Sequence, residues 1–151
     1  MPFISGGASY DGTILPAAGV TVNEFLESWG PRLPEVRRLY AEDFGVSDDQ
    51  GAGRLFGDNR YLIAARTLVR NMARVSSPGR VYYYSFVPAA LRSQVPGARH
   101  GAAGRPLFGH VEDPEAGEVG RVLRAYWLNF GRTGDPNGPG LAEWPVLKVK
   151  Y

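Results

Sequence analysis

The segment RVYYYSFV, residues 80–87, constrains the fold of this chain more than any other stretch. It is rich in β-branched and aromatic residues, which favour β-strands. Apolar side chains occupy both sets of alternating positions, so both faces of such a strand are expected to be covered. Strands of this kind occur in parallel sheets with helices above and below. The segment therefore predicts an α/β fold.

A second strand and a crossover are predicted upstream of this segment. Residues 1–5 form a short apolar run that leads into the turn sequence GGASYDGT. Apolar residues recur at helical spacing over residues 58–74, and Asp58 is placed to cap the first turn of that helix. Because a strand–helix–strand order favours parallel strands, both strands are expected to end at the same edge of one sheet.

Three further helices complete the predicted order of elements. Two short ones are expected at residues 20–29 and 34–40, and a longer one over residues 119–130, where apolar residues again follow helical spacing. Gly131 is expected to end the long helix. The sequence DPNG that follows, residues 135–138, is typical of a turn.

Asp11 and His100 are the candidate catalytic residues. Asp11 follows the first predicted strand and His100 lies in the loop after the second, so both are expected at the carboxyl edge of the sheet, where open α/β folds build their sites. A histidine acts as a general base near neutral pH and works best when a carboxylate fixes its tautomer. The alternative on spacing alone is an exposed loop histidine without a chemical role.

Other candidate sites are weaker. His110 has no cysteine and no third histidine to complete a metal site, and we interpret it as a surface residue near a helix start. The stretch from Gly51 to Gly57 nearly matches a dinucleotide-binding fingerprint, but its third glycine comes one residue late and no strand precedes it. Acidic residues in two clusters are interpreted as a solvated loop: Glu42, Asp43, Asp48 and Asp49. We predict no cofactor and no metal.

Composition excludes several partner classes. The net charge is +2 at pH 7 and the basic residues do not cluster, so nucleic acid is not an expected partner. The run Tyr82–Tyr84 could stack bases, yet without a basic face it is better explained as core strand. No apolar run reaches membrane length, and the N-terminal residues do not resemble a signal peptide, although an upstream signal is compatible with the sequence. The localisation is left open.

The nucleophile that His100 would serve is not found in this chain. A serine hydrolase of the α/β type presents its serine in the motif G-x-S-x-G. None of the serines here lies in that motif; Ser9, in GASYD, comes nearest and lacks the second glycine. No glycine-rich oxyanion loop is present either, so Asp11 and His100 form at most two thirds of a triad.

Four segments, in order, resemble motifs of the type-B carboxylesterases, the cholinesterase-like branch of the α/β-hydrolases. MPFISGGASYDG resembles P-x-x-x-G-x-x-x-x-E/D-G, and GARHGAAGRPLFG resembles G-A-x-H-G-x-E…F-G. Between them, GDNRYLIAARTLVRNMA and VYYYSFVP resemble the helix and strand that precede the family's catalytic histidine. YWLNFGRTGDPNGPGLAEWP resembles W-x-N-F-A-x-T-G-D-P-N…W-P, the most specific of the four.

The resemblance implies a fold, a reaction and roles for two residues. Residues 1–151 would be the C-terminal segment of a carboxylesterase domain: the last sheet strands with flanking helices, incomplete without the N-terminal half. Asp11 would be the triad acid and His100 the triad base of a carboxylic-ester hydrolase. The partners would be a small-molecule ester and the N-terminal half, on the same or a separate polypeptide. The chain departs from the family pattern at Ala103, where a carboxylate is usual, and in using Asp rather than Glu as the acid.

Three hypotheses follow for the chain itself. The first is a piece of a serine carboxylesterase, truncated or naturally split and inactive alone because it lacks the serine. It is expected to be prone to association through exposed aromatic residues: Tyr82, Tyr84, Trp127 and Phe130. The second is a non-catalytic, cholinesterase-like interaction module. The third is a small self-sufficient α/β domain, which would unfold cooperatively.

Overall fold

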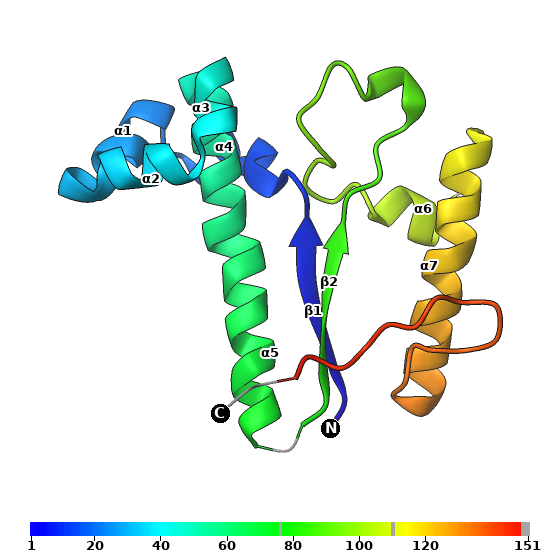
Figure 1. The fold of residues 1–151 in the computed structure, drawn as a ribbon. Helices are drawn as coiled ribbons and strands as arrows, with labels where there is room; N and C mark the ends of the chain where they lie inside the picture. Colours follow the sequence, from blue (N-terminus) through cyan, green and yellow to red (C-terminus); the bar gives the residue numbers. More distant parts are fainter. Residues whose placement is uncertain (76, 110, 149–151) are drawn as a thin grey trace.

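The fold is that of a computed structural model, which describes residues 1–75, 77–109 and 111–148. Two strands, β1 (Phe3–Ala8) and β2 (Gly79–Tyr84), form a parallel sheet in which Phe3 pairs with Gly79 and Ala8 with Tyr84. Figure 1 shows the strands between two long helices, α5 (Ala64–Arg74) and α7 (Pro114–Thr133). The predicted mixture of helices with a parallel sheet is confirmed.

The crossover between the strands is a series of helices. Its α-helices are α1 (Val22–Glu27), α2 (Leu33–Leu39), α3 (Ala41–Val46), α4 (Asp48–Gly57) and α5, and a short α6 (Gly104–Phe108) follows β2. Single turns of 3₁₀-helix lie at η1 (Asp11–Ile14), η2 (Pro16–Ala18), η3 (Gly30–Arg32) and η5 (Ala89–Leu91). Helices α1 and α2 correspond to the two short predicted helices. A capping box between Thr21 and Glu24 fixes the start of α1.

The long crossover helix begins ten residues earlier than predicted. Helix α4 continues without a break through a π-helical stretch, η4 (Asp58–Ile63), into α5. Ser47, not Asp58, caps the first turn by accepting a bond from the N–H of Gln50, and Asp58 makes no capping bond. The expectation of a loop was wrong for all four acids, since they lie in the helices α3 and α4. Their expected exposure to solvent is confirmed for Glu42, Asp48 and Asp49, whereas Asp43 is half-buried.

Both strand boundaries also differ from the prediction. β1 runs on through Gly6 and Gly7, which the sequence placed in a turn; a side chain at Gly6 would collide with the backbone and ring of Tyr82 on the paired strand. β2 ends at Tyr84, which is buried at 5% exposure. Tyr83 points away from the core and is 56% exposed, so the strand is not covered on both faces along its whole length.

Helix α7 is longer than predicted at both ends. The Asp113 carboxylate accepts a bond from the N–H of Ala116 and caps the first turn. The helix passes through Gly131, which was expected to end it, and stops instead at Gly134, whose φ of 77° lies in the left-handed region. Gly131 lies at an exposed position inside the helix.

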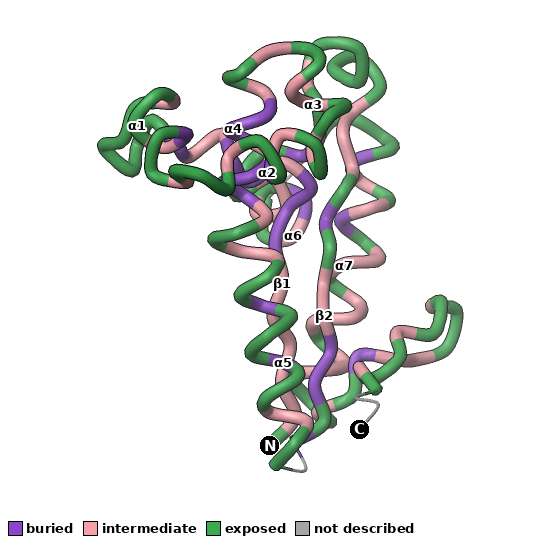
Figure 2. Tube along the Cα trace, turned by 60° about the vertical axis from the view of Figure 1, so that its left-hand side comes forward, coloured by how far each residue is buried: buried purple, intermediate pink, exposed green. Residues whose placement is uncertain are grey.

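Buried residues form two clusters near the carboxyl end of the sheet, and Figure 2 colours the buried positions along the chain. The first packs Leu15 and Leu26 against Ala52 and Phe56 of α4. The second joins Ala8, Tyr84 and Ala98. Of the four aromatic residues expected to be exposed, Tyr84 is buried and the other three are half-buried, so that expectation was wrong.

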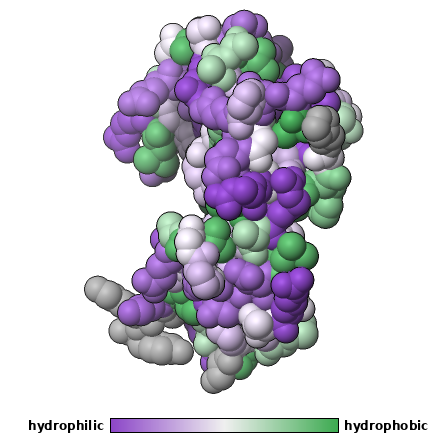
Figure 3. Space-filling view, turned by 90° about the vertical axis from the view of Figure 1, so that its right-hand side faces the viewer, coloured by the Kyte–Doolittle hydropathy of each residue, from purple (hydrophilic) through white to green (hydrophobic). Residues whose placement is uncertain are grey.

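On the side that carries α7, hydrophilic residues cover most of the surface (Figure 3).

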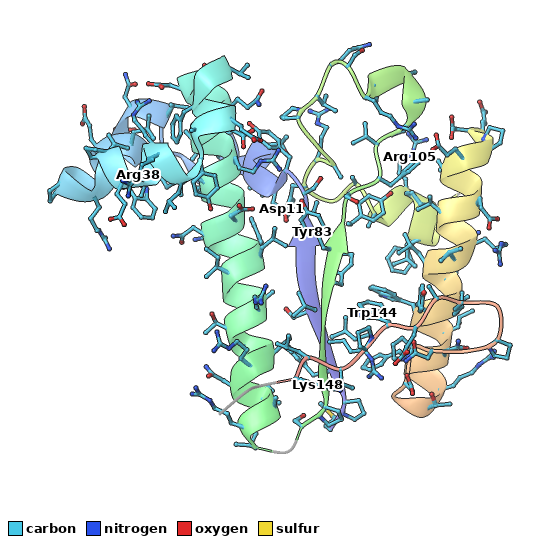
Figure 4. All side chains as sticks on the ribbon, in the orientation of Figure 1. Asp11, Arg38, Tyr83, Arg105, Trp144 and Lys148 are labelled. Atoms are coloured by element: carbon cyan, nitrogen blue, oxygen red, sulfur yellow. The ribbon has the colours of Figure 1, made fainter. Side chains whose placement is uncertain are left out.

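The C-terminal segment returns to the sheet. Arg80, only 7% exposed at its side chain, donates to the Asp135 carboxylate and to the backbone oxygen of Trp144. The Trp144 indole donates to the backbone oxygen of Val81 and packs against Trp127. Figure 4 shows Trp144 between β2 and α7. These contacts hold Asp135 and Trp144 against β2.

Candidate functional site

Asp11 lies at the carboxyl end of β1, in the turn η1, and its side chain is 3% exposed. One carboxylate oxygen, Oδ2, accepts a bond of 2.6 Å from the backbone N–H of Ala8. That bond bends the chain back on itself and fixes the carboxylate at the edge of the sheet, where Figure 4 labels it. The other oxygen, Oδ1, remains available for a second partner.

That partner is His100. The imidazole Nδ1 lies 2.7 Å from Oδ1 of Asp11, so the structure brings the two predicted site residues together. The backbone makes the approach possible because pairing continues beyond the strands. Tyr10 N–H donates to the oxygen of Ala98, and the Ser9 hydroxyl accepts from the N–H of Ala98. The histidine loop therefore runs directly beside the turn that carries Asp11.

The contact defines which imidazole nitrogen is free. A carboxylate is an acceptor, so it favours a proton on Nδ1, and the lone pair of the neutral ring then lies on Nε2. Nε2 makes no hydrogen bond to any of the described residues, and the side chain is 40% exposed. An open hollow of about 470 Å³ adjoins the ring. The pair can act as an oriented general base toward a group in that hollow.

Two residues that sequence reasoning did not select also hold His100. Thr13 accepts a bond of 3.0 Å from the backbone N–H of His100. The Tyr61 ring packs on the imidazole, with the ring centroids 5.0 Å apart. Tyr61 comes from the π-helical stretch η4, and π-turns are frequent at functional sites. Its place in an apolar helical stripe made it look like an ordinary core residue.

Glycines let helix α4 touch the turn that carries Asp11. A side chain at Gly12 would collide with the backbone of Gly53, and one at Gly57 would meet the backbone nitrogens of Asp11 and Gly12. Gly53 in turn leaves room for the Tyr10 hydroxyl. The near-match to a dinucleotide fingerprint is therefore a packing feature of a helix.

Charged and phenolic groups gather behind the pair. Burial raises the pKa of Asp58, and the negative charges of Asp43 and Asp11 raise it further, against the opposing effect of Tyr40 and Arg54. Burial also raises the pKa of Tyr40 to about 12, with an additional contribution from the Asp58 carboxylate. The positive charge of Arg54 lowers both pKa values, and Arg54 forms an ion pair with Asp43.

The remaining predicted candidates do not join the site. Asp43 pairs with Arg54, and Asp48 with the exposed Arg37. His110 lies outside the described residues. Among residues 1–75, 77–109 and 111–148 no group of three or more acidic or histidine side chains could hold a metal ion. In the same part of the chain no helix combines the length and the apolar character needed to cross a bilayer.

Comparison with known proteins identifies the relatives of this chain. It is 33% identical over 133 residues to the pyrethroid hydrolase Ces2a of Mus musculus, an alignment that covers 76% of this chain. It is 29% identical to a medium-chain fatty acyl-CoA hydrolase precursor of Anas platyrhynchos, over 71% of this chain. Carboxylesterase 1C of Rattus norvegicus is 27% identical over 64%. The chain is related to carboxylesterases. The predicted resemblance is confirmed, although no family model matches the chain.

The alignments cover most of this chain but only a small part of each relative. The chain spans about a fifth of the length of the relatives it matches: 19% of the rat carboxylesterase, 22% of the duck hydrolase and 23% of the mouse enzyme. Reactions and substrates named for these proteins belong to their whole length. The comparison therefore establishes a relationship to carboxylesterases, and it assigns no reaction, substrate or residue role to this chain.

Proposed function

We propose that this chain supplies the acid and the base of a Ser-His-Asp triad in a carboxylic-ester hydrolase. His100 is the general base and Asp11 orients it. Residues 1–151 would form the C-terminal segment of an α/β-hydrolase domain, with β1 and β2 as its last strands. The observation that carries the proposal is the 2.7 Å contact between Asp11 and His100 in a chain related to carboxylesterases.

The proposed chemistry follows from the orientation of the imidazole. Nε2 of His100 removes the proton of a serine hydroxyl as the serine attacks the ester carbonyl, and later returns that proton to the leaving alcohol. Asp11 stabilises the imidazolium that forms in between. Water then repeats the cycle on the acyl-enzyme. The serine and the oxyanion donors would come from a part of the enzyme outside these residues, so the chain alone is expected to be inactive.

Labelling with a fluorophosphonate tests this proposal. These reagents bond covalently to a serine whose proton has been taken by a neighbouring base. An epitope tag on this chain, expressed in its own gene context, allows recovery of the chain with whatever polypeptide carries the serine. We expect a labelled serine in the recovered protein and loss of labelling with His100→Gln. Labelling that persists in His100→Gln, or its absence from the recovered protein, would contradict the proposal.

One feature favours a second candidate, a non-catalytic interaction module related to cholinesterases. Ala103 stands where the family usually has a carboxylate, so part of the support of the histidine loop is missing. Against it stands the complete Asp11–His100 contact. An interaction module would keep its partner in His100→Gln and show no serine labelling, so the same experiment separates the two.

A further inference from the structure

We infer that Arg54 is a positioning residue, one that holds the turn of Asp11 and the loop of His100 in register. The guanidinium extends from helix α4 and donates to two backbone oxygens, those of Ser9 and Pro96. Ser9 precedes Asp11 by two residues, and Pro96 precedes His100 by four. One planar cation therefore joins the two segments that carry the two site residues.

Arg54 is itself fixed in place. Its Nε donates to the Asp43 carboxylate at 3.1 Å, and both side chains are largely buried, with exposures of 17% and 16%. The guanidinium carbon lies 5.1 Å from the centre of the Tyr10 ring, over its face. Gln50 holds the other Asp43 oxygen. The guanidinium is thus oriented directly by Asp43 and Tyr10, and Gln50 holds Asp43 in place.

The planar geometry of the guanidinium, with its forked N–H donors, explains why an arginine occupies this position. Five N–H donors in a rigid plane allow separate nitrogens to reach Asp43, Ser9 and Pro96 together, which a single lysine ammonium cannot reproduce. Bonds from a charged donor are also stronger than neutral ones. The backbone bond from Tyr10 to Ala98 and the bond from Ala98 to the Ser9 hydroxyl remain without Arg54, so we expect its loss to loosen the register and not to abolish the fold.

Loss of Arg54 is expected to weaken the Asp11–His100 contact. A shift of the histidine loop by a fraction of an ångström lengthens the bond to Nδ1 and removes the preference for a proton on that nitrogen. The imidazole then passes to the tautomer with a proton on Nε2, in which it no longer serves as a base toward the hollow. The effect on ester hydrolysis rests on the proposed function, whereas the effect on the tautomer does not.

Nitrogen NMR of the histidine side chain tests the inference in this chain. The ¹⁵N shifts of the neutral ring report directly which nitrogen carries the proton, and His100→Gln assigns the signals. We expect Arg54→Met to lower the ratio of the Nδ1–H to the Nε2–H form by about tenfold, as for loss of a net hydrogen-bond contribution. Arg54→Lys, which keeps the charge but not the fork, is expected to lie between Arg54→Met and the unaltered chain.

Arg37→Met is the matched control. Arg37 also forms an ion pair with an aspartate of α4, Asp48, and also lies over an aromatic ring, Phe44, but it is distant from the two loops. We expect no change of tautomer in it. Asp43→Asn is a milder change, because it removes the charge that orients the Arg54 guanidinium toward the oxygens of Ser9 and Pro96. It is therefore expected to act in the same direction as Arg54→Met, by a smaller factor, and it covers the case in which Arg54→Met does not fold.

The outcomes separate this inference from the proposed function. An unchanged tautomer in folded Arg54→Met and Asp43→Asn, with a change in Asp11→Asn, would overturn the positioning role and leave the Asp11–His100 pair intact. An equal change in Arg37→Met would also overturn it. A predominant Nε2–H form in the unaltered chain would overturn both. A lower melting temperature without a change of tautomer would show Arg54 to be structural only.

Discussion

Two arginines hold opposite ends of the sheet, and the comparison between them separates function from stability in this molecule. Arg54, at the carboxyl end of the strands, joins two segments that each carry a site residue. Arg80, near the other end, joins β2 to the C-terminal segment through Asp135 and Trp144. Each pairs with one carboxylate and each reaches backbone oxygen. In our proposal the same chemistry positions the Asp11–His100 pair at one end, whereas at the other end it holds the C-terminal segment on β2.

Arg80→Met should give the largest loss of stability. The side chain is 7% exposed, and its removal leaves the oxygen of Trp144 without this donor and Asp135 without its cation. We expect the free energy of unfolding to fall by about 2 to 3 kcal/mol, measured by urea denaturation. The His100 tautomer should remain that of the unaltered chain in the folded protein. A changed tautomer would mean that the two ends are coupled and would break the comparison.

Gly12→Ala should disturb packing at the end of the sheet that carries Asp11 and His100. The new methyl group would collide with the backbone of Gly53, so helix α4 must move away from the turn that carries Asp11. We expect a loss of about 1 to 3 kcal/mol together with a shift of His100 to the Nε2–H form. Gly131→Ala is the control for a glycine change without a steric clash, because a Cβ at this helical position meets no atom within 4 Å. Retention of the Nδ1–H form in Gly12→Ala would show that α4 does not set the geometry of the pair.

Alkaline titration tests the burial of the Tyr40 phenol behind the site. The pKa of Tyr40, behind the site, is raised to about 12 by burial and by Asp58. Between its ordinary value of 10.0 and about 12, the unfolded chain releases this proton and the folded chain keeps it, so stability falls as the pH rises through that window. Tyr40→Phe should flatten this fall, as followed by thermal unfolding at several pH values. An equally steep fall in Tyr40→Phe would argue against burial of the phenol.

The sequence predicted the parts of the molecule that depend on repeating patterns. Parallel strands end at one edge, so Asp11 and His100 could be placed together from their positions after two strands. The start of α4 was missed because Gly51, Gly53 and Gly57 read as loop residues. In the helix, Gly51 packs against Phe44, whereas Gly53 and Gly57 pack against a turn distant in sequence. Local signals cannot reveal such a contact.

The supporting residues of the site were missed for the same reason. Arg54 lies 45 residues from Ser9 and 42 from Pro96, and no spacing rule connects them. Tyr61 follows an apolar helical pattern, and only the π-helical turn brings it onto the imidazole. Asp43 looked like one of four solvated acids until its pairing with Arg54 was seen. These roles arise from tertiary contacts that a chain pattern does not encode.

The most direct test of the account is the rate at which the recovered, serine-bearing protein hydrolyses a p-nitrophenyl ester, with Asp11 intact and with Asp11→Asn. An asparagine keeps the shape of the side chain but no longer favours the proton on Nδ1. We predict a loss of kcat on the order of 10³ to 10⁴ with little change in KM. Hydrolysis at an unchanged rate in Asp11→Asn would contradict the claim that Asp11 and His100 work as one unit.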